Sequence, residues 1–115
     1  RRALPDDHPA VQQALAALGQ LLQSRGGYEE AIAVQRELTG MAAAGDSPEL
    51  AANMSALAST HFYAGQYDTA DSLNTLVLAM NRRLHGNRHP MVAEDLINLG
   101  ATQFERGNYA EAEEY

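Results

Sequence analysis

The chain contains no cysteine, no tryptophan and no lysine, and only 6% of its 115 residues are aromatic. Without cysteine it can form neither disulfides nor thiolate metal sites. With few aromatic side chains the core must consist of small and medium-sized residues, and frequent alanine favours helix over strand. No apolar run approaches the roughly 18–20 residues that a membrane-spanning helix needs, and no signal-peptide pattern opens the chain. We therefore expect one α-helical, cytoplasmic domain.

Positive charge is also scarce. Eight basic residues, all of them arginine, are set against 15 acidic ones, so the formal net charge is −7. An acidic balance opposes non-specific binding to nucleic-acid phosphates and to anionic membranes. Single-stranded RNA binding by helical repeats needs a basic groove and is disfavoured for the same reason. We expect neither nucleic acid nor a membrane among the partners.

One short pattern, Gly-x-Tyr-x-x-Ala, occurs three times. It occupies residues 26–31, 65–70 and 107–112. Its tyrosines are 39 and 42 residues apart (67 − 28 and 109 − 67). Ten positions before each tyrosine stands a leucine, directly followed by glycine or alanine, and a His-Pro or Ser-Pro pair lies further upstream. Agreement at so many offsets predicts a structural repeat.

Each copy of the repeat predicts a pair of helices. Proline suits the first turn of a helix, and Ser47 is a good N-cap, whereas His8 and His89 at the same place are weaker ones. Glycine commonly ends a helix in the left-handed conformation, so Gly107 and its two counterparts should end the first helices. The small residue after the repeated leucine allows the partner helix to come close. The predicted helices cover residues 9–25, 28–43, 48–64, 67–85, 90–106 and 109 onward.

We interpret the chain as a single domain cut from a longer array. Residues 1–7 then form the tail of an earlier repeat, followed by repeats at 8–46, 47–88 and, truncated, 89–115. The middle junction, at residues 42–48, is three residues shorter than its counterparts, which predicts a shorter second helix or a tighter loop in the first repeat. Because repeats bury their apolar faces only against neighbours, we expect the exposed ends to self-associate, end to end or by exchange of the truncated last helix.

These offsets resemble the tetratricopeptide repeat. The 42-residue spacing and the Leu-x-Gly-x-x-His-Pro stretch at residues 84–90, partly repeated at 4–9, look most like kinesin light chain repeats and their bacterial relatives. The resemblance implies an all-α fold, a right-handed α-solenoid of antiparallel helix pairs. It also implies a non-catalytic scaffold without a cofactor that binds a protein or peptide partner. The alternative is a structural spacer or regulatory array attached to a catalytic domain such as a Ser/Thr kinase.

In this family the first helix of each pair lines a concave groove. The positions that correspond to the groove here are Gln13, Gln20, Ser55, Ser59, Phe62, Tyr63, Glu94, Asn98, Phe104 and Glu105. Chaperone-binding relatives hold a peptide carboxylate with Lys, Arg and Asn at such positions, but only Asn98 matches and no cation is present. An extended, neutral or basic segment with apolar anchors therefore fits better. Phe62 and Phe104 share one repeat position and could instead pack between neighbouring helices.

No pattern indicates an enzyme or a metal site. A phosphate-binding glycine loop and a nucleophile motif are both missing, and the adjacent Glu94 and Asp95 point in different directions on a helix. His85 and His89 have metal-like spacing, but Gly86 and a loop separate them and no third ligand is evident. A buried, hydrogen-bonded role between helices suits His61 better than a functional one. We expect no catalytic, cofactor-binding or metal-binding residue.

Overall fold

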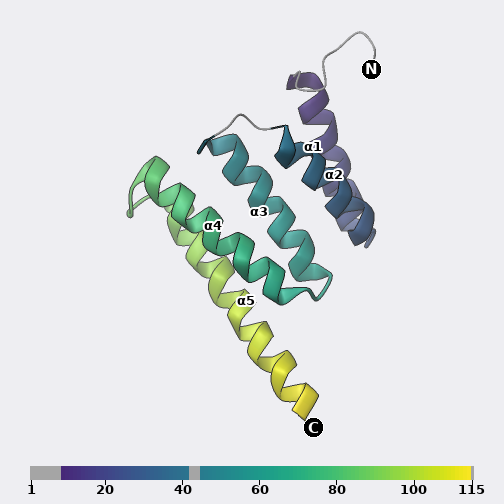
Figure 1. The fold of residues 1–115 in the computed structure, drawn as a ribbon, viewed down its shortest axis with the longest axis vertical. Helices are drawn as coiled ribbons and strands as arrows, with labels where there is room; N and C mark the ends of the chain where they lie inside the picture. The colour runs from purple at the N-terminus through teal and green to yellow at the C-terminus, as the bar shows by residue number, and fades with distance from the viewer. Residues whose placement is uncertain (1–8, 42–44, 115) are drawn as a thin grey trace.

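The computed structural model describes residues 9–41 and 45–114. Residues 1–8, 42–44 and 115 lie outside this part, and with them the predicted tail of an earlier repeat and the cap at His8. The described residues form helices and no strand, which confirms the all-α fold. The helices are α1 (Pro9–Ser24), α2 (Tyr28–Gly40), α3 (Pro48–Tyr63), α4 (Tyr67–His85) and α5 (Pro90–Glu114) (Figure 1).

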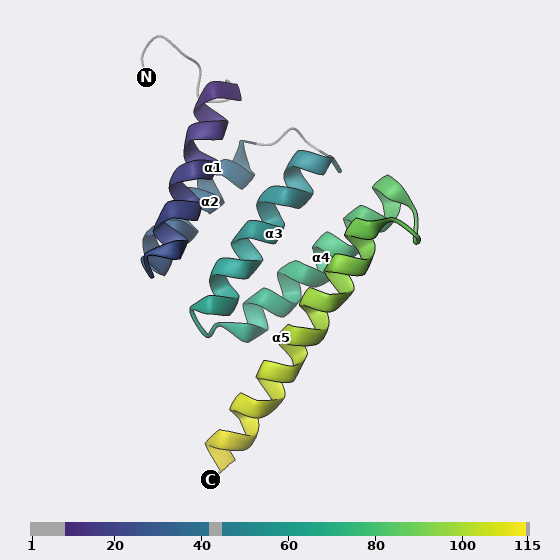
Figure 2. The same cartoon turned by 180° about the vertical axis from the view of Figure 1, so that it is seen from behind.

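The helices form two layers. The first helices of the repeats, α1, α3 and α5, lie side by side on the near face in Figure 2, and the second helices, α2 and α4, lie behind them. The molecule measures 55 × 34 × 19 Å. Its smallest dimension equals about two helix diameters of roughly 10 Å each. One face of the slab is thus made only by the helices that the repeat pattern places in the groove.

The helix ends follow the capping chemistry of the sequence. Ser47 Oγ accepts a hydrogen bond of 3.0 Å from the Leu50 backbone N–H, as predicted for an N-cap. Gly26 and Gly65 end the turns after α1 and α3 with φ of +81° and +80°, a region that residues with a Cβ rarely adopt. The shorter first repeat also has the shorter second helix. Its α2 has 13 residues, whereas α4 in the next repeat has 19.

Small residues at the helix crossings form the centre of the core. Ala31, Ala58 and Ala70 are fully buried at the positions that the repeat reserves for small side chains. At Gly19, in the position of Ala58, an added Cβ would lie only 3.0 Å from Cγ of Gln35. The close approach of α1 and α2 therefore depends on the missing side chain.

A buried polar contact links each repeat to the next. The Thr60 hydroxyl on α3 donates to Oε1 of Gln35 on α2 at 2.6 Å. One repeat later, Nδ2 of Asn74 on α4 donates to the Thr102 hydroxyl on α5 at 3.3 Å. These contacts occupy equivalent repeat positions, because Gln35 and Asn74 are 39 residues apart and the two threonines 42. The sequence analysis did not identify this contact.

One predicted helix boundary is wrong. Gly107 does not end a first helix, because α5 runs without a break from Pro90 to Glu114 and no separate helix begins at 109. Residues 109–114 make fewer than two helical turns, so folding them back would bury little apolar surface. Continuing α5 adds one backbone hydrogen bond per residue and avoids the unfavourable start of a new helix. Glycine therefore ends the turn after a first helix at Gly26 and Gly65, whereas Gly107 lies within a continuous helix.

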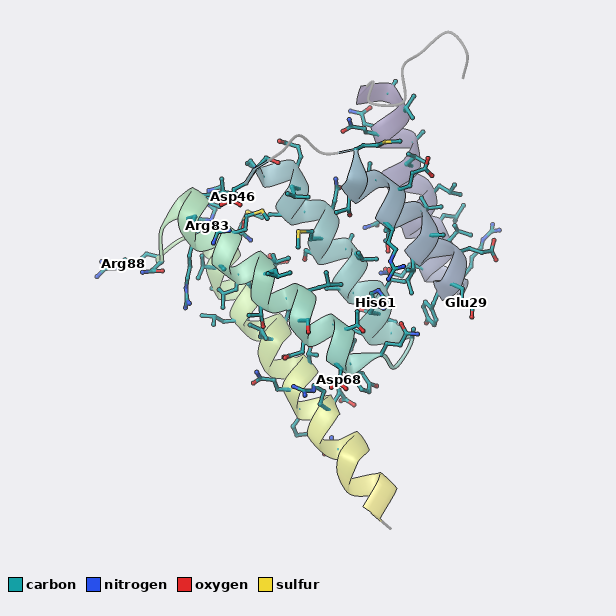
Figure 3. The ribbon with its side chains drawn as sticks, viewed as in Figure 1. Glu29, Asp46, His61, Asp68, Arg83 and Arg88 are labelled. Carbon is teal, nitrogen blue, oxygen red and sulfur yellow. The ribbon has the colours of Figure 1, made fainter. Side chains whose placement is uncertain are left out.

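Exposed ion pairs connect elements at the edges of the slab. Arg83 on α4 binds Asp46, which lies in the connection between α2 and α3, through two nitrogens at 2.5 and 3.1 Å (Figure 3). This bidentate bond lowers the pKa of the Asp46 carboxyl below its ordinary value of 3.8. Arg106 on α5 binds Asp68 at 2.8 Å and Asp71 at 3.3 Å at the start of α4.

Candidate protein-binding groove

The face made by α1, α3 and α5 contains a hollow with acidic side chains, which we call the acidic hollow. Its volume is about 270 Å³. Most of its wall comes from α3, and α1, α4 and α5 close it. The lining residues are Gln20, Ala51, Ala52, Ser55, Ala56, Ser59, Asn81, Met91, Glu94 and Asp95.

A second hollow, the aromatic hollow, lies next to it and shares Ser59 with it. Its volume is about 220 Å³. It lies between the second half of α3 and the middle of α5, with one contribution from α4. The lining residues are Ser59, Phe62, Tyr63, Asn74, Asn98, Ala101 and Thr102. Together the two hollows follow α3 along its length.

The hollows bring together seven of the ten predicted groove residues. They are Gln20, Ser55, Ser59, Glu94, Phe62, Tyr63 and Asn98. Gln13 lines a third hollow between α1, α2 and α3, which meets the acidic hollow at Ala52. Phe104 and Glu105 line none of the three hollows. Phe104 lies further along α5 with 67% of its surface exposed.

The two phenylalanines differ although they share a repeat position. Phe62 is half-buried and packs edge-to-face against Tyr67 and Tyr63, with ring centroids 5.4 and 5.7 Å apart. It therefore both packs between elements and lines the aromatic hollow. Tyr63 is 60% exposed and presents its ring to solvent at the mouth of that hollow. In the described part of the chain Phe104 has no such packing, because α5 continues past it and no second helix folds back beside it.

The floor of the acidic hollow contains two residues that sequence reasoning did not place in the site. Asn81 on α4 and Asp95 on α5 are 1% and 5% exposed. Nδ2 of Asn81 donates to Oδ2 of Asp95 at 2.6 Å, while Oδ1 of Asn81 has no hydrogen-bond partner among the described residues. Polar residues on the helix face that should be buried were the signal that could have identified them.

His61, His85 and His89 make their contacts at the turns between helices. Nδ1 of His61, which is buried, lies 2.6 Å from Oε1 of Gln66 in the turn before α4. The turn after α4 does not separate His85 from His89, because their rings stack with centroids 4.2 Å apart. Nδ1 of His89 accepts from the Met91 backbone N–H at 3.1 Å, so this histidine caps α5. Within the described ranges no three His, Cys, Asp or Glu residues are grouped as metal ligands would be.

Comparison with known proteins identifies the repeat. A sequence profile described as tetratricopeptide repeat matches residues 49–115, more than half of the chain. The chain belongs to the tetratricopeptide repeat family. Repeats of this family are generally scaffolds for protein–protein interaction and are typically not catalytic. A search of curated proteins gave no match.

Two crystal structures from Podosopora anserina share the fold of this tetratricopeptide array. Both are of a kinesin light chain-like protein with nearly identical repeats, one of them a single-residue variant. The variant superposes with a TM-score of 0.79 at 21% identity over 97% of this chain and 54% of its own. The other gives 0.78 at 22% identity over 98% of this chain and 55% of its own. This chain thus spans about half the length of these proteins.

The likeness to kinesin light chain-like repeats confirms the type of repeat that the sequence suggested. The sequence features that suggested this type were the 42-residue spacing and the Leu-x-Gly-x-x-His-Pro stretch. None of the helices in the described ranges is both long enough and apolar enough to cross a membrane.

Proposed function

We propose that this tetratricopeptide array binds an extended segment of a partner protein along the face of α1, α3 and α5. The observation that carries the proposal is the pair of adjoining hollows on that face, which share Ser59 and follow α3. Each hollow is slightly smaller than the roughly 300–1,000 Å³ of small-molecule sites. Their size suits single side chains of a peptide rather than a compact ligand.

The lining of the hollows supports a neutral or basic segment with an apolar anchor. The aromatic hollow offers Phe62, Tyr63 and Ala101, and exposed aromatic residues contribute strongly to protein interfaces. The acidic hollow offers Glu94 and Asp95, and none of the arginines that the structure describes lines either hollow. A partner's acidic side chain or terminal carboxylate would find like charge there and no counter-charge.

The experiment compares one groove variant with one matched control. Tyr63→Ala removes an exposed ring from the aromatic hollow, and Leu76→Ala removes a similarly exposed apolar side chain (55%) from α4, outside the hollows. Affinity for peptides selected from a random extended library should fall with Tyr63→Ala and stay unchanged with Leu76→Ala. If Tyr63→Ala left every affinity unchanged, the spacer role would be favoured instead.

We further propose that second copies of the chain cover its exposed ends. Leu21 on α1 is 47% exposed, although its counterparts Thr60 and Thr102 are buried against the preceding second helix. On α5, Leu96 is 47% exposed and nothing lies within 4 Å of a Cβ added at Gly100. Because the two ends carry different side chains, a head-to-tail contact covers one end of each kind, and this is the contact that we propose.

A further inference from the structure

We propose that the acidic hollow is a subsite for one cationic side chain, arginine or lysine, carried by the extended partner segment. This inference rests on the proposed function and names the chemistry of the partner. Its basis is the buried pair Asn81 and Asp95 on the floor of the hollow, one residue from α4 and one from α5.

Asp95 is a buried acid that pairs with no cation among the described residues. It is 5% exposed, and the Asn81 amide donates to one of its oxygens. Among the described residues, the arginine ion pairs are those of Arg83 and Arg106 with other carboxylates. Buried charges in proteins are usually paired, because removing a carboxylate from water is unfavourable. A cation from outside the chain would supply the missing counter-charge.

The second observation is the free acceptor on Asn81. Its Oδ1 is buried and has no hydrogen-bond partner in the described part of the chain, although buried polar atoms are nearly always paired. The orientation of the amide is fixed, because Nδ2 must face the Asp95 carboxylate to donate to it. The floor therefore holds a carboxylate that accepts one hydrogen bond, beside an amide oxygen that accepts none from the described residues. Guanidinium and ammonium groups are donors only.

The walls suit the stem of a long basic side chain. Ala51, Ala52 and Ala56 of α3 supply methyl groups along which an aliphatic stem can lie while its charged end reaches the floor. Glu94 is exposed at the rim and adds a second negative charge. Arginine should bind better than lysine, because its planar fork can reach two acceptors at once.

A free divalent cation fits the hollow less well. Calcium takes six to eight oxygen ligands, whereas the hollow has two carboxylates, one of which already accepts from Asn81. In the residues that the structure describes, no group of three or more potential metal ligands occurs.

The distance from the acidic hollow to the aromatic hollow sets the spacing between the two partner residues that occupy them. Asn98 lies one helical turn after Glu94 on α5, and Phe62 lies about two turns after Ser55 on α3. At 5.4 Å per turn these offsets correspond to roughly 5–11 Å. An extended chain advances about 3.3 Å per residue, so a cationic residue and an apolar residue two or three positions apart would occupy both hollows.

The test uses blocked octapeptides selected from a random library for binding to the whole chain. For each peptide, arginine is replaced by citrulline, its neutral isostere, and lysine by glutamine. Affinities are measured by NMR titration against the wild type, Asp95→Asn and Glu37→Gln. Glu37→Gln removes the same charge from α2, on the opposite layer. Thermal unfolding of each variant verifies that it is folded.

The expected result is a coupling between the peptide cation and Asp95. Asp95→Asn should weaken the cationic peptides about tenfold, or about 1.4 kcal/mol, and leave their neutral isosteres unchanged, whereas Glu37→Gln should affect neither. Equal affinity for cationic and neutral peptides, or equal weakening of both by Asp95→Asn, would overturn the subsite. Peptides that bind without a cation but respond to Tyr63→Ala would overturn the subsite alone. Failure to select any binder would count against the groove function itself.

Discussion

The Thr60 hydroxyl of α3 donates a hydrogen bond of 2.6 Å to Oε1 of Gln35 on α2, and both residues are at most 3% exposed. Nε2 of Gln23 on α1 donates in turn to the same hydroxyl at 2.9 Å. One threonine therefore joins three helices. Its counterpart Thr102 lies at the same repeat position but accepts instead, from Nδ2 of Asn74 at 3.3 Å, so a buried polar contact recurs between successive repeats.

Removing the Thr60 hydroxyl alone should lower the free energy of unfolding. Thr60→Val leaves the buried Gln35 oxygen without its donor, and an unsatisfied buried polar group costs about 1–3 kcal/mol. The double variant Thr60→Val with Gln35→Leu should lose less than the sum of the single variants. Urea unfolding measures the free energy of unfolding of the single and double variants. Thr69→Val, on the exposed side of α4, is the control. Additive losses would show that the two residues do not act together.

Two glycines at equivalent positions should respond differently to alanine. Gly100→Ala, where nothing lies within 4 Å of the new Cβ, should raise the free energy of unfolding by about 0.5–1 kcal/mol through helix propensity. Gly19→Ala places its Cβ 3.0 Å from Cγ of Gln35, whose amide is held by Thr60, so the gain should be cancelled or reversed. Chemical denaturation compares the two, and equal effects would refute the packing role of Gly19.

The tie between Asp46 and Arg83 should weaken in acid. The guanidinium hydrogen bond holds the pKa of Asp46 below its ordinary value of 3.8. A group with a depressed folded-state pKa stabilises the fold above its unfolded pKa, and this contribution is lost as the pH falls through the folded pKa. Asp46→Asn should therefore lower stability at neutral pH and have no effect in strong acid.

The pKa of Asp46 can be followed directly by NMR of its carboxyl carbon. The titration midpoint should lie below 3.8 in the wild type and rise in Arg83→Gln, the variant that removes the charged donor. High salt should move the wild-type midpoint in the same direction, because the pair is solvent-exposed and screened. A midpoint unaffected by Arg83→Gln would contradict the assigned cause.

Association of copies should be head-to-tail. Leu21→Glu on α1 and Leu96→Glu on α5 each place a charge on one exposed apolar end, so each variant alone should sediment as a monomer at high concentration. An equimolar mixture should form one-to-one dimers, because each variant retains one intact end. Leu76→Glu on α4 should associate like the wild type. A mixture that stayed monomeric would exclude head-to-tail contact.

The sequence predicted those features that depend on local chemistry. Ser47 capped a helix and Gly65 ended a turn as predicted, because caps and left-handed glycines act through their own few neighbours. The repeat offsets also predicted Gln20, Ser59 and Asn98 on one face, where two hollows adjoin. Offsets alone cannot show that Asn81 reaches the floor of this face, because its place depends on how deeply α4 packs behind α3 and α5.

The failed prediction at Gly107 has the same origin. A glycine permits a helix to end but does not force it to end. Whether α5 turns depends on whether the residues that follow have an apolar surface to cover. Arg106, one residue earlier, binds Asp68 and Asp71 on α4 and holds α5 against α4 up to that point.

The unbroken α5 leaves Gly100 and Gly107 exposed within a helix, where each glycine is about 1 kcal/mol less favourable than alanine. The two glycines thus weaken the straight form, and an apolar surface that covered Leu96 would compete against a destabilised helix. We therefore expect α5 to end at Gly107 when such an apolar surface is present. A glycine that can end a helix does so only when an apolar surface is present for the following residues to pack against.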